Sequence, residues 1–282
     1  MFSNTLVTTE DLAAHLNDPN WVVLDCRFTL TDPEAGRQAY TKAHIPGARY
    51  VHLDSDLSAP IGETTGRHPL PDPRVLTEKL CQWGVGVNKQ VVVYDDSYGS
   101  MAVRLWWMMR WLGHPGVALL DGGYPKWARE KRPLNAEVPT PHKAACACLP
   151  EPTQIVEADE VLRASQTGEQ LIIDARPDRR FSGEFEPLDP VAGHVPGAIN
   201  WPFDENLDVD GTYLPPEALR ENYQALLKGK PAWQVIHMCG SGVTACHNIL
   251  AMEIAGLPGS RLYPGSWSEW ITDPARPVAT GE

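Results

Sequence analysis

The stretch Val235-Ile-His-Met-Cys-Gly-Ser-Gly-Val-Thr-Ala245 joins three local patterns. Its first four residues form a short apolar run of the kind found in buried β-strands. Gly240 and Gly242 lie in the turn that follows, and a helical pattern of apolar residues then covers 245–255. A strand that passes through a glycine-bearing loop into a helix is the repeating unit of an α/β domain with a parallel sheet.

The same pattern occurs earlier in the chain, because Val91-Val-Val-Tyr-Asp95 matches Val235-Ile-His-Met-Cys239 at an offset of 144 residues. Four matched blocks in one order indicate that two copies of a single domain were joined. The three further pairs are Asp25-Cys-Arg27 with Asp174-Ala-Arg176, His44-Ile-Pro-Gly-Ala48 with His194-Val-Pro-Gly-Ala198, and Gly122-Gly-Tyr-Pro-Lys-Trp127 with Gly265-Ser-Trp-Ser-Glu-Trp270.

Each copy alternates short apolar runs with helical patterns, which predicts a parallel sheet flanked by helices. Five prolines fall within 133–152, so we expect this segment to be a linker. The predicted domains are therefore 1–132 and 153–282. The expected strands are 21–24, 91–94, 117–120, 171–173, 235–238 and 261–263, and the expected helices are 9–16, 73–83, 100–112, 157–164, 216–227 and 245–255.

The charge balance of the chain argues against several classes of function. Lysine and arginine number 24 against 36 aspartates and glutamates, so the formal net charge is −12. Nucleic acids and anionic membrane surfaces both need a basic partner surface, so we expect neither as a partner. No apolar run approaches the ~18 residues of a membrane span, and the first residues lack the pattern of a secretory signal. We expect a cytoplasmic protein.

Six cysteines are present, and we expect a cytoplasmic chain to keep them reduced. Cys146 and Cys148 form a C-x-C pair near His142, but a second close-spaced ligand pair is missing, so we predict no metal site. Cys239 has the context of a nucleophile, because it directly follows a predicted strand. Ligands of open α/β sheets bind beyond the carboxyl ends of the strands.

The loop after Cys239 has the composition of an anion-binding turn. Gly240 and Gly242 allow a tight turn in which successive N–H groups point at one spot beside a helix N-terminus. Such a nest favours the reactive thiolate form of Cys239. A cysteine phosphatase would need an arginine six residues after its nucleophile, where this chain has Ala245. The other class of enzyme that places a cysteine in such a loop carries sulfur on that cysteine as a persulfide.

In these blocks the chain resembles the tandem-domain rhodaneses, the thiosulfate and 3-mercaptopyruvate sulfurtransferases. The resemblance covers nearly the whole chain and includes the H-[IV]-P-G-A block of both halves, the tryptophan block near the end of each half, and a Cys239 loop similar to the mercaptopyruvate type. It implies two rhodanese-like α/β domains, of which the first is catalytically inactive because Asp95 stands in place of the cysteine. No metal or other cofactor is implied.

The resemblance also implies a reaction and a set of catalytic residues. Cys239 would take sulfane sulfur from a small anionic donor and pass it to cyanide, a small thiol or a thioredoxin-like protein thiol. Asp54 would orient His68, which would relay a proton through Ser241. The substrate-binding loop residues would be Gly240, Gly242, Val243 and Thr244.

A substrate anion needs local positive charge in an acidic protein. Arg180 matches a substrate-binding arginine of the family, and an arginine fork suits a carboxylate or sulfonate. Mercaptopyruvate-type members carry a second arginine in the loop before G-H-[IV]-P-G, but residues 183–193 are acidic here and contain none. Arg179 is a candidate replacement. Arg27 and Arg176 recur in both copies, so we interpret them as structural.

Two alternatives to a mercaptopyruvate sulfurtransferase stay open. The first is a rhodanese that prefers thiosulfate, because the missing arginine weakens the preference for a carboxylate donor. The second is a persulfide carrier or sulfur-relay protein, which would turn over small donors poorly and react with a specific protein thiol.

Overall fold

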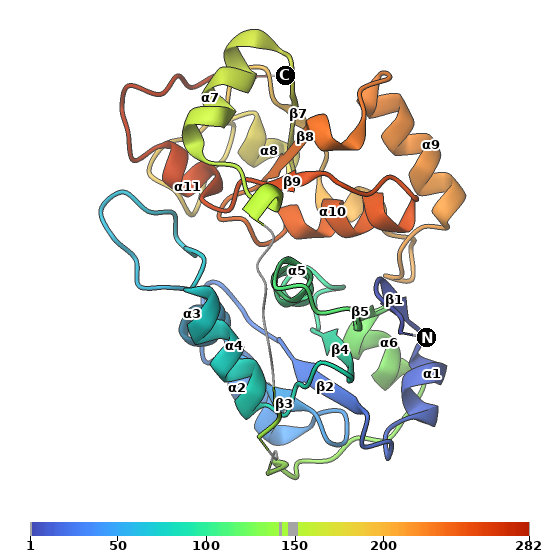
Figure 1. Cartoon of the computed structure of the whole chain (residues 1–282). Helices are drawn as coiled ribbons and strands as arrows, with labels where there is room; N and C mark the ends of the chain where they lie inside the picture. The colour runs from blue at the N-terminus through green and yellow to red at the C-terminus, as the bar shows by residue number, and fades with distance from the viewer. Residues whose placement is uncertain (1, 141–142, 146–151, 282) are drawn as a thin grey trace. The chain divides into compact units, whose positions relative to one another are not determined.

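The computed structural model describes residues 2–140, 143–145 and 152–281, which form two compact units (Figure 1). Each unit includes one short segment from the other half of the chain. The first unit comprises Met1–Ala59, Pro71–Glu151 and Asp208–Tyr213, and the second comprises Pro60–Leu70, Pro152–Leu207 and Leu214–Glu282.

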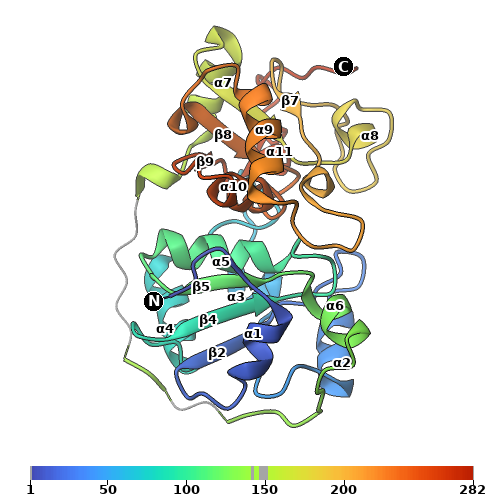
Figure 2. The same ribbon diagram turned by 90° about the vertical axis from the view of Figure 1, so that its right-hand side faces the viewer.

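The first unit is built on a parallel sheet with the strand order β1-β5-β4-β2-β3. On β4, Val92 and Tyr94 belong to a core cluster with Trp127, while Val91 and Val93 point to the other face and are also fully buried. Helix α5 runs along β4 and β5 (Figure 2). The strands are β1 (Leu6–Val7), β2 (Trp21–Asp25), β3 (Arg49–Tyr50), β4 (Gln90–Tyr94) and β5 (Val117–Leu120), and the helices are α1 (Thr9–Ala14), α2 (Ala35–Lys42), α3 (Leu53–Leu57), α4 (Pro73–Gln82), α5 (Ala102–Trp111) and α6 (Gly123–Arg129).

The second unit has a parallel sheet with the strand order β7-β6-β8-β9. Ile172, Ile236 and Met238 pack from the sheet against Trp267 and Trp270. The strands are β6 (Leu171–Asp174), β7 (Ile199–Asn200), β8 (Val235–Met238) and β9 (Arg261–Leu262), and the helices are α7 (Ala158–Thr167), α8 (Asp178–Phe181), α9 (Pro216–Leu227), α10 (Ala245–Ile254) and α11 (Ser266–Trp270), with 3₁₀ turns η1 (Pro152–Gln154), η2 (Phe203–Asn206) and η3 (Ala232–Gln234). The predicted α/β class with parallel sheets flanked by helices is confirmed in both units.

In the first unit, the blocks that recur in the sequence meet at a buried ion pair. Arg27 donates to both carboxylate oxygens of Asp25 at the end of β2, and the distance from Nη2 to Oδ2 is 2.6 Å. The same Nη2 donates to the carbonyl oxygen of Ala43, which directly precedes the His44-Ile-Pro-Gly-Ala48 block. The hydroxyl of Tyr94 on β4 also donates to Asp25, so the pair ties two strands to a loop.

The second unit repeats this arrangement at the end of β6. Arg176 donates to Asp174, with 2.8 Å from Nη2 to Oδ2, and to the carbonyl oxygen of Gly193. Burial lowers the pKa of Arg176, but the charges of Asp174, Glu186 and Cys239 raise it, and the net shift is upward. Arg176 is therefore a fixed positive charge. Both recurring arginines hold strand ends, as their recurrence indicates.

The structure adds three strands that the sequence analysis did not predict, and it corrects one expectation about the cysteines. β1, β3 and β7 each contain only two residues, which is too short for a periodic pattern to predict them. Cys81 is disulfide-bonded, whereas Cys26, Cys239 and Cys246 have free thiols, so the expectation of six reduced cysteines is wrong for Cys81. The C-x-C pair at Cys146 and Cys148, the neighbouring His142 and part of the predicted linker 133–152 lie outside the described residues.

We expect Asp25→Ala to lower the free energy of unfolding by about 3–5 kcal/mol, because it leaves the buried Arg27 guanidinium without its partner charge. Urea unfolding followed by tryptophan fluorescence measures this change. Glu63→Ala removes an exposed carboxylate and serves as the control, with an expected change within 0.5 kcal/mol. Equal effects of the two substitutions would show that the pair does not stabilise the fold.

Candidate active site

Cys239 directly follows β8 and is held by the start of α11. The residue is buried, with only 2% of its surface exposed. Its N–H donates to Ser266 Oγ at 3.1 Å, and its carbonyl oxygen accepts from the N–H of Trp267 at 3.0 Å. The next carbonyl oxygen, of Gly240, accepts from the N–H of Ser268 at 2.9 Å. The main chain around the thiol is therefore fixed before any substrate binds.

The loop after Cys239 shares one backbone turn and one contact with the loop after Asp95 in the first unit. Gly242 has φ of +75°, and Tyr98 at the matching position has φ of +58°, so both loops turn in the left-handed region. The carbonyl oxygen of Asp95 accepts from the N–H of Tyr124 at 2.8 Å, which matches the contact of Cys239 with α11. The two loops therefore start alike, and they differ at the next position, where Gly99 has φ of +92° and the matching Val243 is not in the left-handed region.

In the first unit, the carboxylate of Asp95 occupies the N–H groups of the loop. Its Oδ1 accepts from Ser97 and Gly99, and its Oδ2 accepts from Met101 and Ala102, each at 2.8 Å. These bonds satisfy donors that the beginning of a helix leaves unpaired. The first loop is therefore an anion nest whose N–H groups are already bound to the carboxylate of Asp95.

In the second unit, the same kind of donors are open. Cys239 is too short to reach them as Asp95 does in the other loop. Several N–H groups of this loop donate to no protein atom in the described part of the chain, namely those of Gly240, Ser241, Val243, Thr244 and Ala245. The second loop is thus an anion nest with its hydrogen-bond donors still available.

His68 contacts the loop through Ser241. Its Nδ1 lies 2.7 Å from Ser241 Oγ, and both residues are buried. His68 belongs to the Pro60–Leu70 segment, which forms part of the second unit. Asp54 lies on α3 of the first unit, where its N–H donates to His52 Nδ1. The second unit thus brings together Cys239, Ser241 and His68, and Asp54 is not part of that unit.

Two guanidinium groups lie against Gly240. A β-carbon at this position would be 3.2 Å from Arg67 Nη2 and 3.3 Å from Arg180 Nη1. Arg180, in α8, donates from Nε to both carboxylate oxygens of Glu186 at 3.0 Å and from Nη2 to Asp189 Oδ2 at 2.9 Å. The sequence analysis identified Arg180 but not Arg67, because the position next to His68 carries no spacing signal of its own.

The candidate replacement Arg179 faces solvent. It pairs with Glu184 at 3.1 Å, and the side chains are 64% and 65% exposed. Its guanidinium also lies over the ring of Phe185. Arg179 therefore belongs to the surface of the acidic 183–193 loop.

Among the described residues, no group of three or more histidine, cysteine, aspartate or glutamate side chains could hold a metal ion. No helix in the described ranges is both long and apolar enough to cross a membrane.

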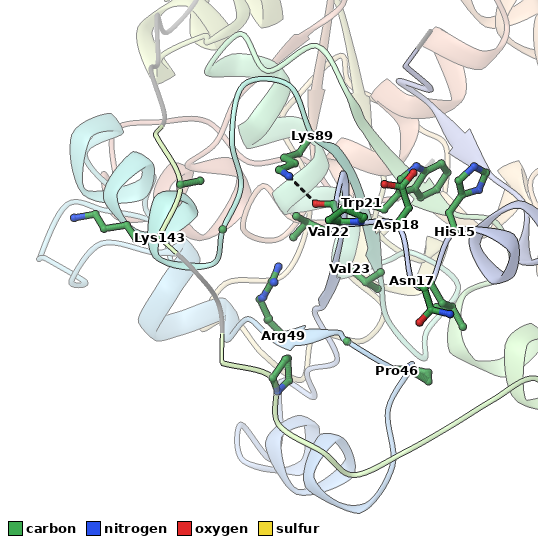
Figure 3. A pocket seen from close by; sticks show the side chains of 16 residues that line it. His15, Asn17, Asp18, Trp21, Val22, Val23, Pro46, Arg49, Lys89 and Lys143 are labelled. Carbon is green, nitrogen blue, oxygen red and sulfur yellow. Dashed lines mark hydrogen bonds between the residues drawn. The ribbon is translucent and has the colours of Figure 1, made fainter.

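A pocket of about 510 Å³ in the first unit is a different kind of site (Figure 3). It lies at the amino ends of two strands, because its lining includes Trp21, which begins β2, and Lys89, which precedes β4. Its described lining residues include no cysteine. Open α/β sheets bind ligands at the carboxyl ends of their strands, which is where Cys239 lies and this pocket does not.

His237 lies on β8, two residues before Cys239, and burial lowers its pKa to about 3. The unfolded chain binds a proton below its ordinary pKa of 6.5, while the folded protein does not, so the free energy of unfolding falls as the pH drops from about 6.5 towards 3. We expect His237 to lower the free energy of unfolding by about 2 kcal/mol at pH 5 relative to pH 8. Urea unfolding of the wild type and of His237→Leu at both pH values measures it. An equal pH dependence in the two proteins would contradict the prediction.

Comparison with known proteins places these observations in a family. The model of the rhodanese-like domain matches residues 8–130 and again 157–273. A relative from Pseudomonas aeruginosa, named "Probable 3-mercaptopyruvate sulfurtransferase", is 48% identical over 100% of both chains. The 3-mercaptopyruvate sulfurtransferase of Escherichia coli K12 is 34% identical over 96% of each chain.

Solved structures agree with the sequence relatives. The crystal structure of SseA from Escherichia coli superposes with a TM-score of 0.80 at 31% identity, covering 94% of this chain and 100% of that one. The 3-mercaptopyruvate sulfurtransferase from Leishmania major gives a TM-score of 0.83 at 29% identity, covering 95% of this chain and 74% of that one. The resemblance found in the sequence is confirmed, and the chain belongs to the rhodanese family, with two rhodanese-like domains.

Proposed function

We propose that the protein is a sulfurtransferase that takes the thiol sulfur of 3-mercaptopyruvate onto Cys239 as a persulfide and passes this sulfane sulfur to cyanide or a thiol. The observation that carries the proposal is the open anion nest around a free thiol, in contact with a buried serine–histidine pair. The names of relatives with 48% and 34% identity support the donor.

In the first half-reaction, the Cys239 thiolate attacks the sulfur of 3-mercaptopyruvate. An S–S bond forms, and the C–S bond of the donor breaks. The electron pair of that bond leaves on pyruvate as its enolate, which takes one proton at carbon to become pyruvate. The sulfur stays on the protein as a Cys239 persulfide. In the second half-reaction, a thiolate or cyanide attacks the outer sulfur, the S–S bond breaks, and Cys239 returns as a thiolate.

The comparison of the two loops supports the persulfide. The outer sulfur of a persulfide is the second atom beyond Cβ, the same place that the carboxylate oxygens have in Asp95. In the first unit, those oxygens accept four N–H bonds at 2.8 Å. A persulfide anion on Cys239 would accept hydrogen bonds from the matching N–H groups of the second loop, those of Ser241, Val243 and Ala245.

The proton for the enolate would come from the Ser241–His68 pair. The 2.7 Å contact between Ser241 Oγ and His68 Nδ1 lets a proton pass from the imidazole to the hydroxyl as the hydroxyl gives up its own. In this proposal Asp54 orients His68, as the family pattern implies.

The comparison of the Asp95 and Cys239 loops also supports different roles for the two domains. We assign domain 1–132 a non-catalytic role, because Asp95 replaces the nucleophile and fills the nest. Domain 153–282, joined through the linker 133–152, carries the nucleophile. The free Cys239 thiol must remain reduced to act, so we propose that the protein works in the cytoplasm, with a small thiol or a thioredoxin-like protein thiol as acceptor.

We expect Cys239→Ser to lower kcat/KM for sulfur transfer from 3-mercaptopyruvate to cyanide by about 1,000-fold or more, because no persulfide can form. Steady-state thiocyanate production measures the loss, and Cys26→Ala, at a free buried thiol of the first unit, is the control. Activity that survives in Cys239→Ser would contradict the mechanism.

The same assay separates the alternatives. A higher kcat/KM for thiosulfate than for 3-mercaptopyruvate would identify a thiosulfate-preferring rhodanese. A wild-type protein that forms the persulfide, seen as the mass of one added sulfur, but turns over neither donor would be a carrier.

We expect His68→Gln to lower kcat about 100-fold or more with little change in KM, because the proton relay is lost while donor contacts remain. The pH profile of kcat should lose the limb that His68 titration produces. His15→Gln, in the first unit, is the control. An unchanged pH profile would show that His68 only supports the loop.

A further inference from the structure

Arg67 makes three contacts around the Cys239 loop that the sequence did not predict. Its N–H donates to Ser268 Oγ at 2.9 Å, which fixes its main chain against α11. Its Nη1 donates to Asp189 Oδ1 at 2.6 Å. Its Nη2 lies at the face of Gly240, next to the nucleophile.

Asp189 holds Arg67 and Arg180 side by side. One carboxylate oxygen accepts from Arg67 Nη1, and the other accepts from Arg180 Nη2 at 2.9 Å. The Asp189 side chain is only 3% exposed, so this bridge is buried. Glu186 fixes Arg180 from a second direction. The acidic residues of the 183–193 loop therefore position two guanidinium groups.

The bridge leaves hydrogen-bond donors free on both arginines. Arg67 Nε is buried and has no hydrogen-bond partner among the described residues. Arg67 Nη2 and Arg180 Nη1, the atoms closest to Gly240, likewise donate to no protein atom in the described ranges. Two guanidinium edges with free N–H groups therefore converge beside Cys239.

We propose that Arg67 is the second anion-binding arginine of this site and that it binds the carboxylate of the sulfur donor together with Arg180. This inference rests on the proposed function and adds a residue that binds its donor, an α-keto acid. Arg67 supplies, from the Pro60–Leu70 segment, the charge that the Arg-free loop 183–193 lacks. Asp189 is a positioning residue that sets the spacing of the two guanidinium groups.

The chemistry of the donor fits this arrangement. A carboxylate is planar and accepts two parallel N–H bonds from a guanidinium edge, which gives both strength and orientation. Held by its carboxylate at Arg67 and Arg180, the donor would present its thiol-bearing carbon towards Cys239. The sulfonate end of thiosulfate lacks this planar geometry, so loss of Arg67 should affect the two donors unequally.

The test measures donor binding apart from turnover. In a Cys239→Ala background, which cannot react, isothermal titration with 3-mercaptopyruvate gives Kd. We expect Arg67→Gln to raise this Kd about 10- to 100-fold, as the loss of a charge-assisted contact does, and Arg67→Lys to restore only part of it. Arg179→Gln removes an equal charge from the surface and should change Kd less than 2-fold.

A double-mutant comparison tests the role of Asp189. Because Asp189 acts through the arginines, Asp189→Asn should weaken binding more in the presence of Arg67 than in the Arg67→Gln protein, where only Arg180 is left for it to position. Additive effects, or tighter binding in Asp189→Asn, would overturn its role as a positioning residue.

Each outcome bears on Arg67 separately from the persulfide chemistry. An unchanged Kd in Arg67→Gln, an equal effect of Arg179→Gln, or no binding of 3-mercaptopyruvate to the Cys239→Ala protein would overturn the inference. The mass of the wild-type protein after treatment with 3-mercaptopyruvate reports the proposed function on its own. If the persulfide forms while Kd is insensitive to Arg67, only the inference fails; if no persulfide forms while Kd depends on Arg67, only the proposed reaction fails.

Discussion

The backbone N–H groups at the start of a helix, gathered beside the end of a parallel strand, are the constraint on which both units depend. Such donors cannot stay buried and unpaired without cost, so the protein must supply an acceptor or keep the place for a ligand. In the first unit, the carboxylate of Asp95 is that acceptor. In the second, Cys239 leaves the donors open. The residue at one loop position thus decides whether the N–H groups are bound by the chain itself or stay available for a ligand.

Much of this organisation could be predicted from the sequence because it is local or repeated. The strand, the glycine loop and the helix around Cys239 are contiguous, and the duplication shows itself as matched blocks with nearly constant offsets. The structure adds the reason for the recurring arginines, which bind an aspartate two residues earlier and a carbonyl group before the next block. The contact of His68 with Ser241 needed the family resemblance, since no local pattern marks a loop histidine.

What could not be predicted depends on contacts between distant residues. Arg67 lies 122 residues from Asp189 and 201 from Ser268, and neither separation leaves a periodic trace in the sequence. The sequence shows that the loop 183–193 is acidic. It does not predict that Asp189 is buried or that it bridges two arginines, because both depend on the folded unit. Two-residue strands such as β1 are likewise fixed by their neighbours in the sheet rather than by their own residues.

The exchange of segments between the units has a consequence for the independence of the two halves. Gly66 fits so closely that a β-carbon there would be 2.5 Å from the carbonyl oxygen of Gly265, so the Pro60–Leu70 strip has become part of the second unit's structure. Cutting the chain between residues 133 and 152 would separate this segment, with Arg67 and His68, from the unit that holds Cys239. The duplicated halves have therefore lost their independence, because the second unit is complete only with residues that the first half of the sequence supplies.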